Sequence, residues 1–439
     1  MTDHRDPIEA WLSADVEPLS PPPGTFERVH RRARRRKAVR TISAAAGAAV
    51  IVAAAATLPQ VASGLLTGQP TNLNGGFKGQ APTESGRVLR GYGPPLSKAG
   101  SGPSPAANFR PTSVTFVDNR LGAVLGQAGS CGPRPCIVMA GTPDYGRRWT
   151  KIGAPPAGPP DASSGVSQVR FLSASNGWAY GPGLYATHDG GRTWRRINHP
   201  GRVLDLSTVG TRVFAVIGTG CTSTGPDFAT GCTGFALYSA AARSRQWQAV
   251  TAASGTGPAA PGGLQLSGDG GFLVASGRLY AGPVSAGAWH PVRAAQPAAP
   301  PCLIRSSARG PWLLAPAARA VYLVCRSSPP TARQKLALYI SPDRGRTWQA
   351  RGAAPAAATS LAVSPRGPLV LATTAGIYIS RDARTWQVAK LTGPAPNGGF
   401  GFVGMTTSAN GVAVPANSAL HEIFITRDGG QTWRPSVIR

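Results

Sequence analysis

Few side chains in this sequence could act as a general acid, a general base or a nucleophile. After residue 60 the acidic residues are Glu84, Asp118, Asp144, Asp161, Asp189, Asp205, Asp227, Asp269, Asp343, Asp382, Glu422 and Asp428. Hydrolysis of a glycosidic bond requires two carboxylates placed across that bond. Five of these acids lie in a repeated turn motif, Glu84 lies in a predicted linker, and Glu422 directly precedes a motif. The sequence shows no pairing among the others, so it does not favour a hydrolase.

Metal and cofactor chemistry has even less support. The histidines are His4, His30, His188, His199, His290 and His421, and they form no spaced cluster. The chain lacks a Cys-x-x-Cys pair, a Gly-x-Ser-x-Gly nucleophile motif and a glycine-rich phosphate loop. We therefore predict no metal, no cofactor and no catalytic residue. His188 lies inside one of the repeated turns, where we expect a variable surface position.

The six cysteines all follow residue 60: Cys131, Cys136, Cys221, Cys232, Cys302 and Cys325. An even number confined to one part of the chain is typical of disulfides in an oxidising compartment, although six cysteines allow fifteen connectivities. Local pairs, 131–136, 221–232 and 302–325, are favoured because each falls within one repeat unit. Buried free thiols are the alternative, and the Gly- and Pro-rich settings of the first two pairs argue against it.

The strongest pattern is the motif Ser/Thr-x-Asp-x-Gly-x-Thr-Trp. Three copies are complete, at 187–194, 341–348 and 426–433; a fourth at 142–149 lacks the second Thr, and a fifth at 380–386 is one residue short. Asp and Ser/Thr side chains can accept backbone N–H groups in a tight turn, Gly reaches positive φ, and Trp buries a large ring. The residues predicted to have this structural role are Asp144, Trp149, Asp189, Gly191, Trp194, Asp343, Gly345, Trp348, Asp382, Trp386, Asp428, Gly430 and Trp433.

These tryptophans, with Trp247 and Trp289, recur every 38 to 59 residues. Each interval contains about four short β segments separated by turn residues, as in 166–172, 176–181, 183–191 and 193–197. Repeats of ~40–50 residues with four strands are typical of propeller blades. The prediction is an all-β, seven-bladed β-propeller of four-stranded blades over residues 106–439, with an open sandwich as the alternative. Both end units contain four strands, so no shared closing strand is evident, although 86–91 could add one.

The motif resembles the BNR or Asp-box repeat of sialidases, sortilin-type receptors and propellers similar to photosystem II assembly factors. A phrase such as 171–181 before the motif at 187–194 is most similar to the last group, and the resemblance covers about residues 111–436. It implies that the box aspartates are structural and lie at the outer rim. Sialidases also have an arginine triad, a Tyr–Glu pair and an Arg-Ile-Pro motif. Here residues 109–111 read Phe-Arg-Pro, and no suitable Glu is free, so the resemblance does not extend to that activity.

Residues 38–58 form an alanine-rich stretch that is apolar apart from Arg40 and small hydroxyl residues, and seven further Lys or Arg lie just before it at 28–37. An apolar run of about 20 residues spans a bilayer as a helix, and Lys and Arg remain on the cytoplasmic side. We expect an uncleaved anchor rather than a signal peptide cleaved near 61–63, because the ~40 preceding residues exceed a usual n-region. The protein is then a single-pass protein of the plasma membrane with a cytoplasmic N-terminus and an extracytoplasmic propeller.

The remaining regions follow from composition. Residues 1–37 are expected to be a mostly disordered cytoplasmic tail with a basic end, which contacts anionic lipid headgroups. Residues 59–105 are rich in Gly, Pro and Ser and are expected to be a linker. The net charge is +27, but beyond the anchor the Lys and Arg are scattered, which does not favour a nucleic-acid partner.

The prediction for function is a membrane-anchored propeller that binds an envelope protein or a polysaccharide, as a binding or scaffold module. A rigid ring with many loops and few acids supports it. A glycan-active hydrolase of sialidase-like fold is the alternative. A sensor is a third class, but the tail contains no recognisable signalling domain.

Overall fold

A computed structural model describes residues 81–439 apart from internal gaps, the longest of them at 223–230, 301–312 and 327–334. Contacts divide the chain into two units, 1–73 and 74–439, and the second contains all the described residues. The predicted tail, the apolar stretch 38–58 and the start of the linker lie outside those residues. Within the described part of the chain, no helix has the length and apolarity needed to cross a membrane.

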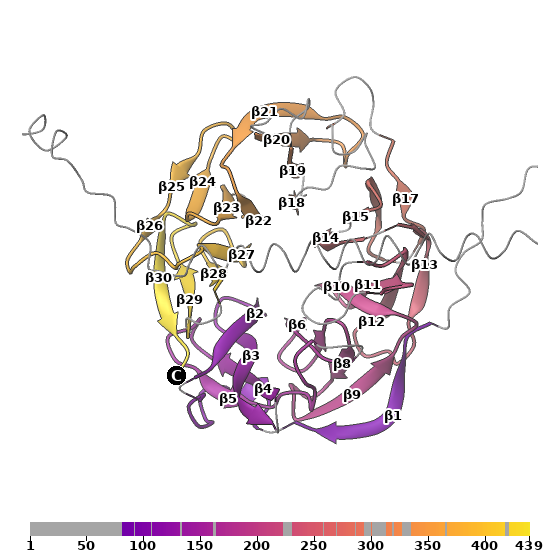
Figure 1. Ribbon diagram of the computed structural model, residues 1–439, viewed down its shortest axis with the longest axis vertical. Coiled ribbons are helices and arrows are strands. Elements are labelled where there is room, and N and C mark those ends of the chain that lie inside the picture. Colours follow the sequence, from indigo (N-terminus) through magenta and orange to yellow (C-terminus); the bar gives the residue numbers. More distant parts are fainter. Residues whose placement is uncertain are drawn as a thin grey trace, which may run out of the picture. The chain divides into compact units, whose positions relative to one another are not determined.

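The described unit is a ring of seven antiparallel sheets, each with four strands that follow one another in the chain (Figure 1). The first four blades are β2 (Arg110–Phe116), β3 (Gly122–Cys131), β4 (Arg134–Thr142) and β5 (Thr150–Ile152); β6 (Gln168–Phe171), β7 (Gly177–Tyr180), β8 (Leu184–Thr187) and β9 (Thr193–Asn198); β10 (Arg202–Val209), β11 (Arg212–Thr219), β12 (Gly234–Ala241) and β13 (Gln248–Thr256); and β14 (Ala259–Ser267), β15 (Gly270–Ala275), β16 (Arg278–Pro283) and β17 (His290–Pro291).

The last three blades are β18 (Leu313–Pro316), β19 (Val321–Arg326), β20 (Leu336–Ser341) and β21 (Gln349–Ala354); β22 (Ala358–Val363), β23 (Leu369–Thr373), β24 (Ile377–Ser380) and β25 (Gln387–Val388); and β27 (Phe400–Met405), β28 (Gly411–Pro415), β29 (Glu422–Thr426) and β30 (Thr432–Val437). The predicted all-β fold with seven four-stranded blades is therefore confirmed, and the sandwich alternative is wrong. The middle strands are apolar on both faces because each sheet packs between two others; all residues of β7 and β23 are buried.

Each blade's tryptophan packs against the preceding blade. Trp194 joins a core with Leu125 and Ile152 of the first blade, and Trp348 joins a core with Phe272 of the fourth. The two sites that keep only the tryptophan, Trp247 and Trp289, pack in the same way. The expectation that the indole is buried against a neighbouring sheet is confirmed at these positions. The apolar cores thus lie between blades and hold the ring together.

The same rule closes the ring. Trp149 of the first blade packs with Val412, Ile423 and Ile425 of the last blade. Its Nε1 donates to Ser436 Oγ at 2.9 Å, and Ser436 also bonds to the carbonyl of Gly146. The first and last blades therefore meet through side chains and turns, and among the described residues no strand is shared between these two blades. We call this junction the seam.

The propeller begins earlier in the chain than the predicted boundary at 106. Residues Thr83–Arg90 form β1, an antiparallel fifth strand on the outer edge of β9, and Thr83 also bridges to Gln246 of the third blade. The short helix η1 (Leu96–Lys98) buries Leu96 completely. The segment expected to add a closing strand at 86–91 covers the second blade instead. At the other end of the chain, β26 (Lys390–Leu391) pairs in parallel with β30.

His188 is not the variable surface position that the sequence suggested. Its Nε2 lies 2.9 Å from Oε1 of Glu84 on β1, and its Nδ1 lies 3.1 Å from Oδ1 of Asn176. The Glu84 side chain is 2% exposed, and its other oxygen lies 3.9 Å from Nε of Arg195 and of Arg245. A buried carboxylate needs such partners, so His188 helps to hold β1 on the second blade.

Candidate functional site

The Asp boxes form the turns between the third and fourth strands of their blades. In the second blade, Thr187 Oγ1 donates to Asp189 Oδ1 at 2.9 Å and accepts from the Gly191 N–H at 2.7 Å. Asp189 also accepts from the N–H of Thr193 at 2.8 Å. Gly191 has φ 95°, where a side chain would be strained. The box side chains therefore form their hydrogen bonds with the backbone and side chains of their own tight turn.

The other boxes repeat this geometry. Asp343 and Asp428 each accept from a backbone N–H four residues later, at 2.7 and 2.9 Å. The shortened box keeps the aspartate: Asp382 accepts from the N–H groups of Arg384 and Thr385, and Ala383 takes the positive φ, 57°. In Asp189, burial raises the carboxyl pKa, but the bonds from Thr193 and Thr187 outweigh it, and the pKa lies below its ordinary value. Each of these box carboxylates thus accepts its hydrogen bonds from groups in its own turn.

We expect Thr187→Val to lower the free energy of unfolding by about 2 kcal/mol. The change is isosteric, but it leaves the buried Gly191 N–H without a partner and removes one of the two hydrogen bonds to Asp189 Oδ1. Chemical denaturation followed by tryptophan fluorescence measures the difference. Thr193→Val in the same box is the matched control, because its hydroxyl donates to Asp189 Oδ2 rather than accepting from a buried backbone N–H. Equal losses in the two variants would contradict the assignment of Thr187 as the centre of the turn.

The acids outside the boxes that are described are dispersed. Asp118 accepts from two N–H groups of its own turn, and Asp205 is buried and accepts from the Leu264 N–H, which joins two blades. Burial raises the pKa of Glu422 on β29. Asp161, Asp227 and Asp269 lie outside the described residues. In the described part of the chain, no three His, Cys, Asp or Glu side chains gather as metal ligands would.

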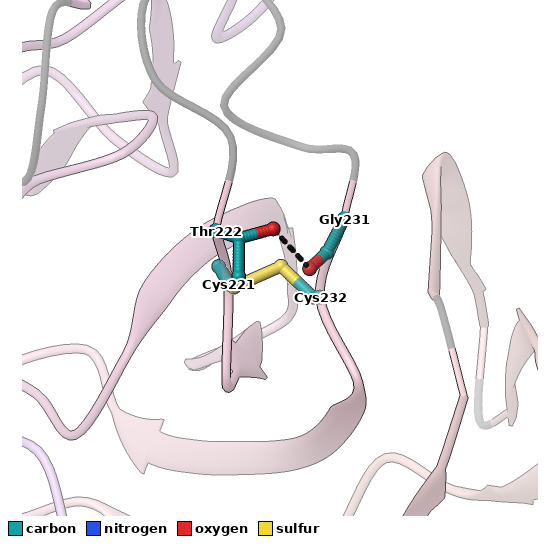
Figure 2. The surroundings of a disulfide bond; sticks show 4 residues. All are labelled: Cys221, Thr222, Gly231 and Cys232. Carbon is teal, nitrogen blue, oxygen red and sulfur yellow. Dashed lines mark hydrogen bonds between the residues drawn. A yellow bond between two sulfur atoms is a disulfide. The ribbon is translucent and has the colours of Figure 1, made fainter. Parts of the chain in front are cut away.

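One predicted disulfide is present. Cys221 and Cys232 are joined at the base of the loop between β11 and β12, where the Thr222 hydroxyl also donates to the Gly231 carbonyl at 3.5 Å (Figure 2). Cys136 and Cys325 are also disulfide-bonded. The other predicted pairs include Cys131 and Cys302, whose side chains lie outside the described residues. The bond at 221–232 holds the two ends of a loop that joins the second and third strands of its blade.

The ring has two distinct faces because its first strands run in one direction. Ser113 and Thr115 accept from the N–H groups of Val169 and Phe171, which places β2 and β6 in parallel. Each first strand starts beside the end of its second strand, as Arg202 beside Gly218 shows. We call this the loop face: first strands start here, second strands end here and third strands begin here, as at Thr219 and Gly234. The Asp boxes lie at the opposite face.

A pocket is lined by residues of the first two blades and the last. Their strands β2, β6 and β27 lie nearest the ring centre (Figure 1). The volume of the pocket is about 350 Å³. It is lined by Pro111, Thr112, Ser113, Val114, Gln168, Arg170, Gly401, Phe402, Val414, Pro415 and Ala416. These residues come from the starts of β2, β6 and β27 and from the end of β28. We call it the axial pocket.

The axial pocket carries one charge. The Arg170 guanidinium lies 5.9 Å from the centre of the Phe402 ring and donates to the carbonyl of Val169 at 3.0 Å. Thr112 Oγ1 already donates toward the carbonyls of Leu125 and Ser167, at 3.2 and 3.0 Å. The lining contains no carboxylate, imidazole, thiol or phenol. Its groups can bind an anionic or amide group beside an aromatic ring, but they offer no acid–base pair.

Sequence reasoning did not single out any residue of this pocket. In residues 168–171 the polar Gln168 and Arg170 alternate with the apolar Val169 and Phe171, which places the two polar side chains on one face of a strand. That pattern could have identified an inner strand with a polar face toward the ring centre. It could not have identified Phe402, which reaches the site from more than 230 residues further along the chain.

Comparison with known proteins identifies the repeat. A BNR/Asp-box repeat is matched at residues 424–435, so this propeller carries BNR/Asp-box repeats. No curated protein is detectably similar in sequence.

Solved propellers are similar in structure. YCF48 bound to a D1 peptide is 17% identical, with 64% of this chain and 82% of that chain covered and a TM-score of 0.40. The extracellular domain of a putative one-component system from B. thetaiotaomicron is 11% identical (77% and 39% covered, TM-score 0.46), and an ancestral GH74 enzyme is 12% identical (76% and 47% covered, TM-score 0.46). This chain spans less than half the length of the last two. The similarity concerns the fold alone.

Proposed function

We propose that this protein is a binding module anchored in the plasma membrane, and that its propeller recognises an envelope protein outside the cell through the axial pocket. The observation that carries the proposal is the pair Arg170 and Phe402 in a pocket that has no acid–base group. The anchor rests on the apolar stretch 38–58 after a basic block. The disulfides support an oxidising compartment for the propeller.

The lining favours a protein side chain over a sugar ring. A sugar presents many hydroxyls, each of which needs a hydrogen-bond partner in a buried site. Thr112 is committed to two backbone carbonyls, and Ser113 accepts from the Val169 N–H, so Gln168 and Arg170 supply most of the remaining polar capacity. The apolar wall of Pro111, Pro415 and Val414 suits the aliphatic stem of an acidic side chain whose carboxylate reaches Arg170.

The hydrolase alternative has no comparable support at this site. Two carboxylates across a scissile bond are required, and none lines the axial pocket. The box carboxylates are held in their own turns, and Asp205 joins two blades. These observations favour binding over turnover.

We expect Arg170→Gln to weaken partner binding at least about tenfold, because a charge-assisted bond beside an aromatic ring is lost. A photoreactive amino acid at the exposed rim position Gln168 would trap the partner in cells that produce the full chain. The trapped product should be lost in Arg170→Gln and in Phe402→Ala. It should persist in Arg120→Gln, the control, which removes an exposed arginine from the turn between β2 and β3.

The same cells test the topology. Protease added outside intact cells should digest the trapped product, and glycosidases should leave it intact. A product that only glycosidases shift would replace the protein partner with a polysaccharide. A product protected until the cells are lysed would overturn the extracytoplasmic placement, and a product unchanged in Arg170→Gln would overturn the role of the axial pocket.

A further inference from the structure

The seam between the first and last blades carries a second cavity with a different chemistry. Its volume is about 620 Å³, and it lies between the box turn of the first blade and the outer strand β30 of the last. Five arginines line it: Arg147, Arg148, Arg427, Arg434 and Arg439. They come from positions almost 300 residues apart in the chain and meet because the ring closes here. We call it the seam groove.

Little negative charge faces these arginines. The Asp144 carboxylate already accepts from the backbone N–H groups of Arg147 and Arg148, from Thr142 Oγ1, and from Nε of Arg148 at 3.1 Å. Within the described residues, no carboxylate side chain pairs with Arg147, Arg427 or Arg434. Three of the five guanidinium groups thus have no acidic side-chain partner, and their summed positive potential attracts an anion.

Arg427 shows the effect of this crowding. Its Nη2 donates to the Tyr145 carbonyl at 2.8 Å, and the guanidinium lies 5.7 Å from the centre of the Tyr145 ring. These contacts fix one side of the group across the seam and leave other N–H donors facing the groove. Burial, and then the nearby Arg147, lower the pKa of Arg427 from its ordinary value. The Arg427 guanidinium is therefore held in a fixed position near other positive charges and has no acidic partner of its own among the described residues.

We propose that the seam groove binds clustered phosphate groups. A carboxylate has two oxygens in one plane and is satisfied by one guanidinium fork, whereas a phosphate can accept from several donors in different directions. The arginines of the seam groove converge from two box turns, from β30 and from the residues after β30, and this arrangement matches a phosphate. The groove has no large accessible aromatic surface, because Trp149 is buried, so the ligand is recognised by charge. Free oligophosphate and a phosphodiester polymer of the envelope share this chemistry.

Binding of inorganic tripolyphosphate to the purified full chain, by isothermal titration at 150 mM salt, tests the proposal. Arg147→Gln combined with Arg434→Gln should raise the Kd at least about tenfold, since both side chains are exposed and neither bonds across the seam. The matched control combines Arg192→Gln and Arg346→Gln, which occupy the same box position as Arg147 in two other blades. The control removes the same net charge and should change the Kd less than about twofold. Thermal unfolding verifies that all variants are folded.

Citrate, with three carboxylates, is the chemical control and should bind at least about tenfold more weakly than tripolyphosphate. Equal weakening in the two double variants, equal binding of citrate, or no binding to the wild type would each overturn the proposal. Competition by a glycerol-phosphate oligomer would support it and identify a phosphodiester polymer as the source. Binding of tripolyphosphate alone would support it with free oligophosphate as the source. The axial pocket lies elsewhere, so neither result bears on the proposed protein partner.

Discussion

Replacing Trp194 with alanine should lower the free energy of unfolding by ~3–5 kcal/mol, the usual loss for a large buried aromatic residue. Trp194 is completely buried and packs against Leu125 and Ile152 of the preceding blade. Its ring lies edge-to-face with Phe171, 6.4 Å between centres, and its Nε1 donates to the carbonyl of Gly153 at 3.3 Å. The change therefore opens a cavity between two blades, where the apolar core of the propeller lies.

Trp386 is the matched control for this effect. It belongs to the shortened box, is only partly buried, and its Nε1 has no hydrogen-bond partner. Trp386→Ala should cost only ~1–2 kcal/mol. Urea denaturation followed by circular dichroism compares the two variants, with Trp194→Phe as a milder change if Trp194→Ala does not fold. A loss at Trp386 as large as that at Trp194 would contradict the view that complete boxes hold the blades together more strongly than the degraded one.

His199 should make the protein less stable in mild acid, by about 3 kcal/mol between pH 7 and pH 4. The residue follows β9, and its Nδ1 is buried without a hydrogen-bond partner. Burial lowers the pKa of His199 to about 4; Arg196 acts in the same direction, and the Gly201 backbone opposes it. A histidine in the unfolded chain has a pKa near 6.5. Between these values the unfolded chain binds more protons, so stability is lost as pH falls through this window.

The variant His199→Asn isolates the contribution of His199 to the pH dependence of stability, because asparagine does not ionise. Its free energy of unfolding should change little between pH 6.5 and 4.5, whereas that of the wild type should fall steeply. The box carboxylates have pKa values below their ordinary 3.8 and lose their contribution only at lower pH, so the two effects are separable. Parallel curves for wild type and variant across this window would show that folding does not lower the pKa of His199.

The sequence determined the architecture because each box is a local structure. The Thr187 hydroxyl, the Asp189 carboxylate and Gly191 close one turn within a few residues, and the following tryptophan must bury a large ring. Recurrence of that unit at blade spacing was sufficient to predict the number of blades, their four strands and the burial of the tryptophans. The disulfide 221–232 was likewise predictable, because its cysteines lie close together in one blade.

Only the tertiary structure decided where candidate binding residues meet. Arg170 and Phe402 share a pocket, and Arg147 and Arg434 share a groove, only because the ring brings the first and last blades together. The docking of β1 on the second blade, with Glu84 against His188, also depends on a contact about 100 residues apart in the chain. Such pairings leave no periodic trace in a single sequence, because the energy that selects them arises when separate sheets pack against each other. Short motifs are sufficient to predict the local turns, whereas a site between blades forms only when the ring closes.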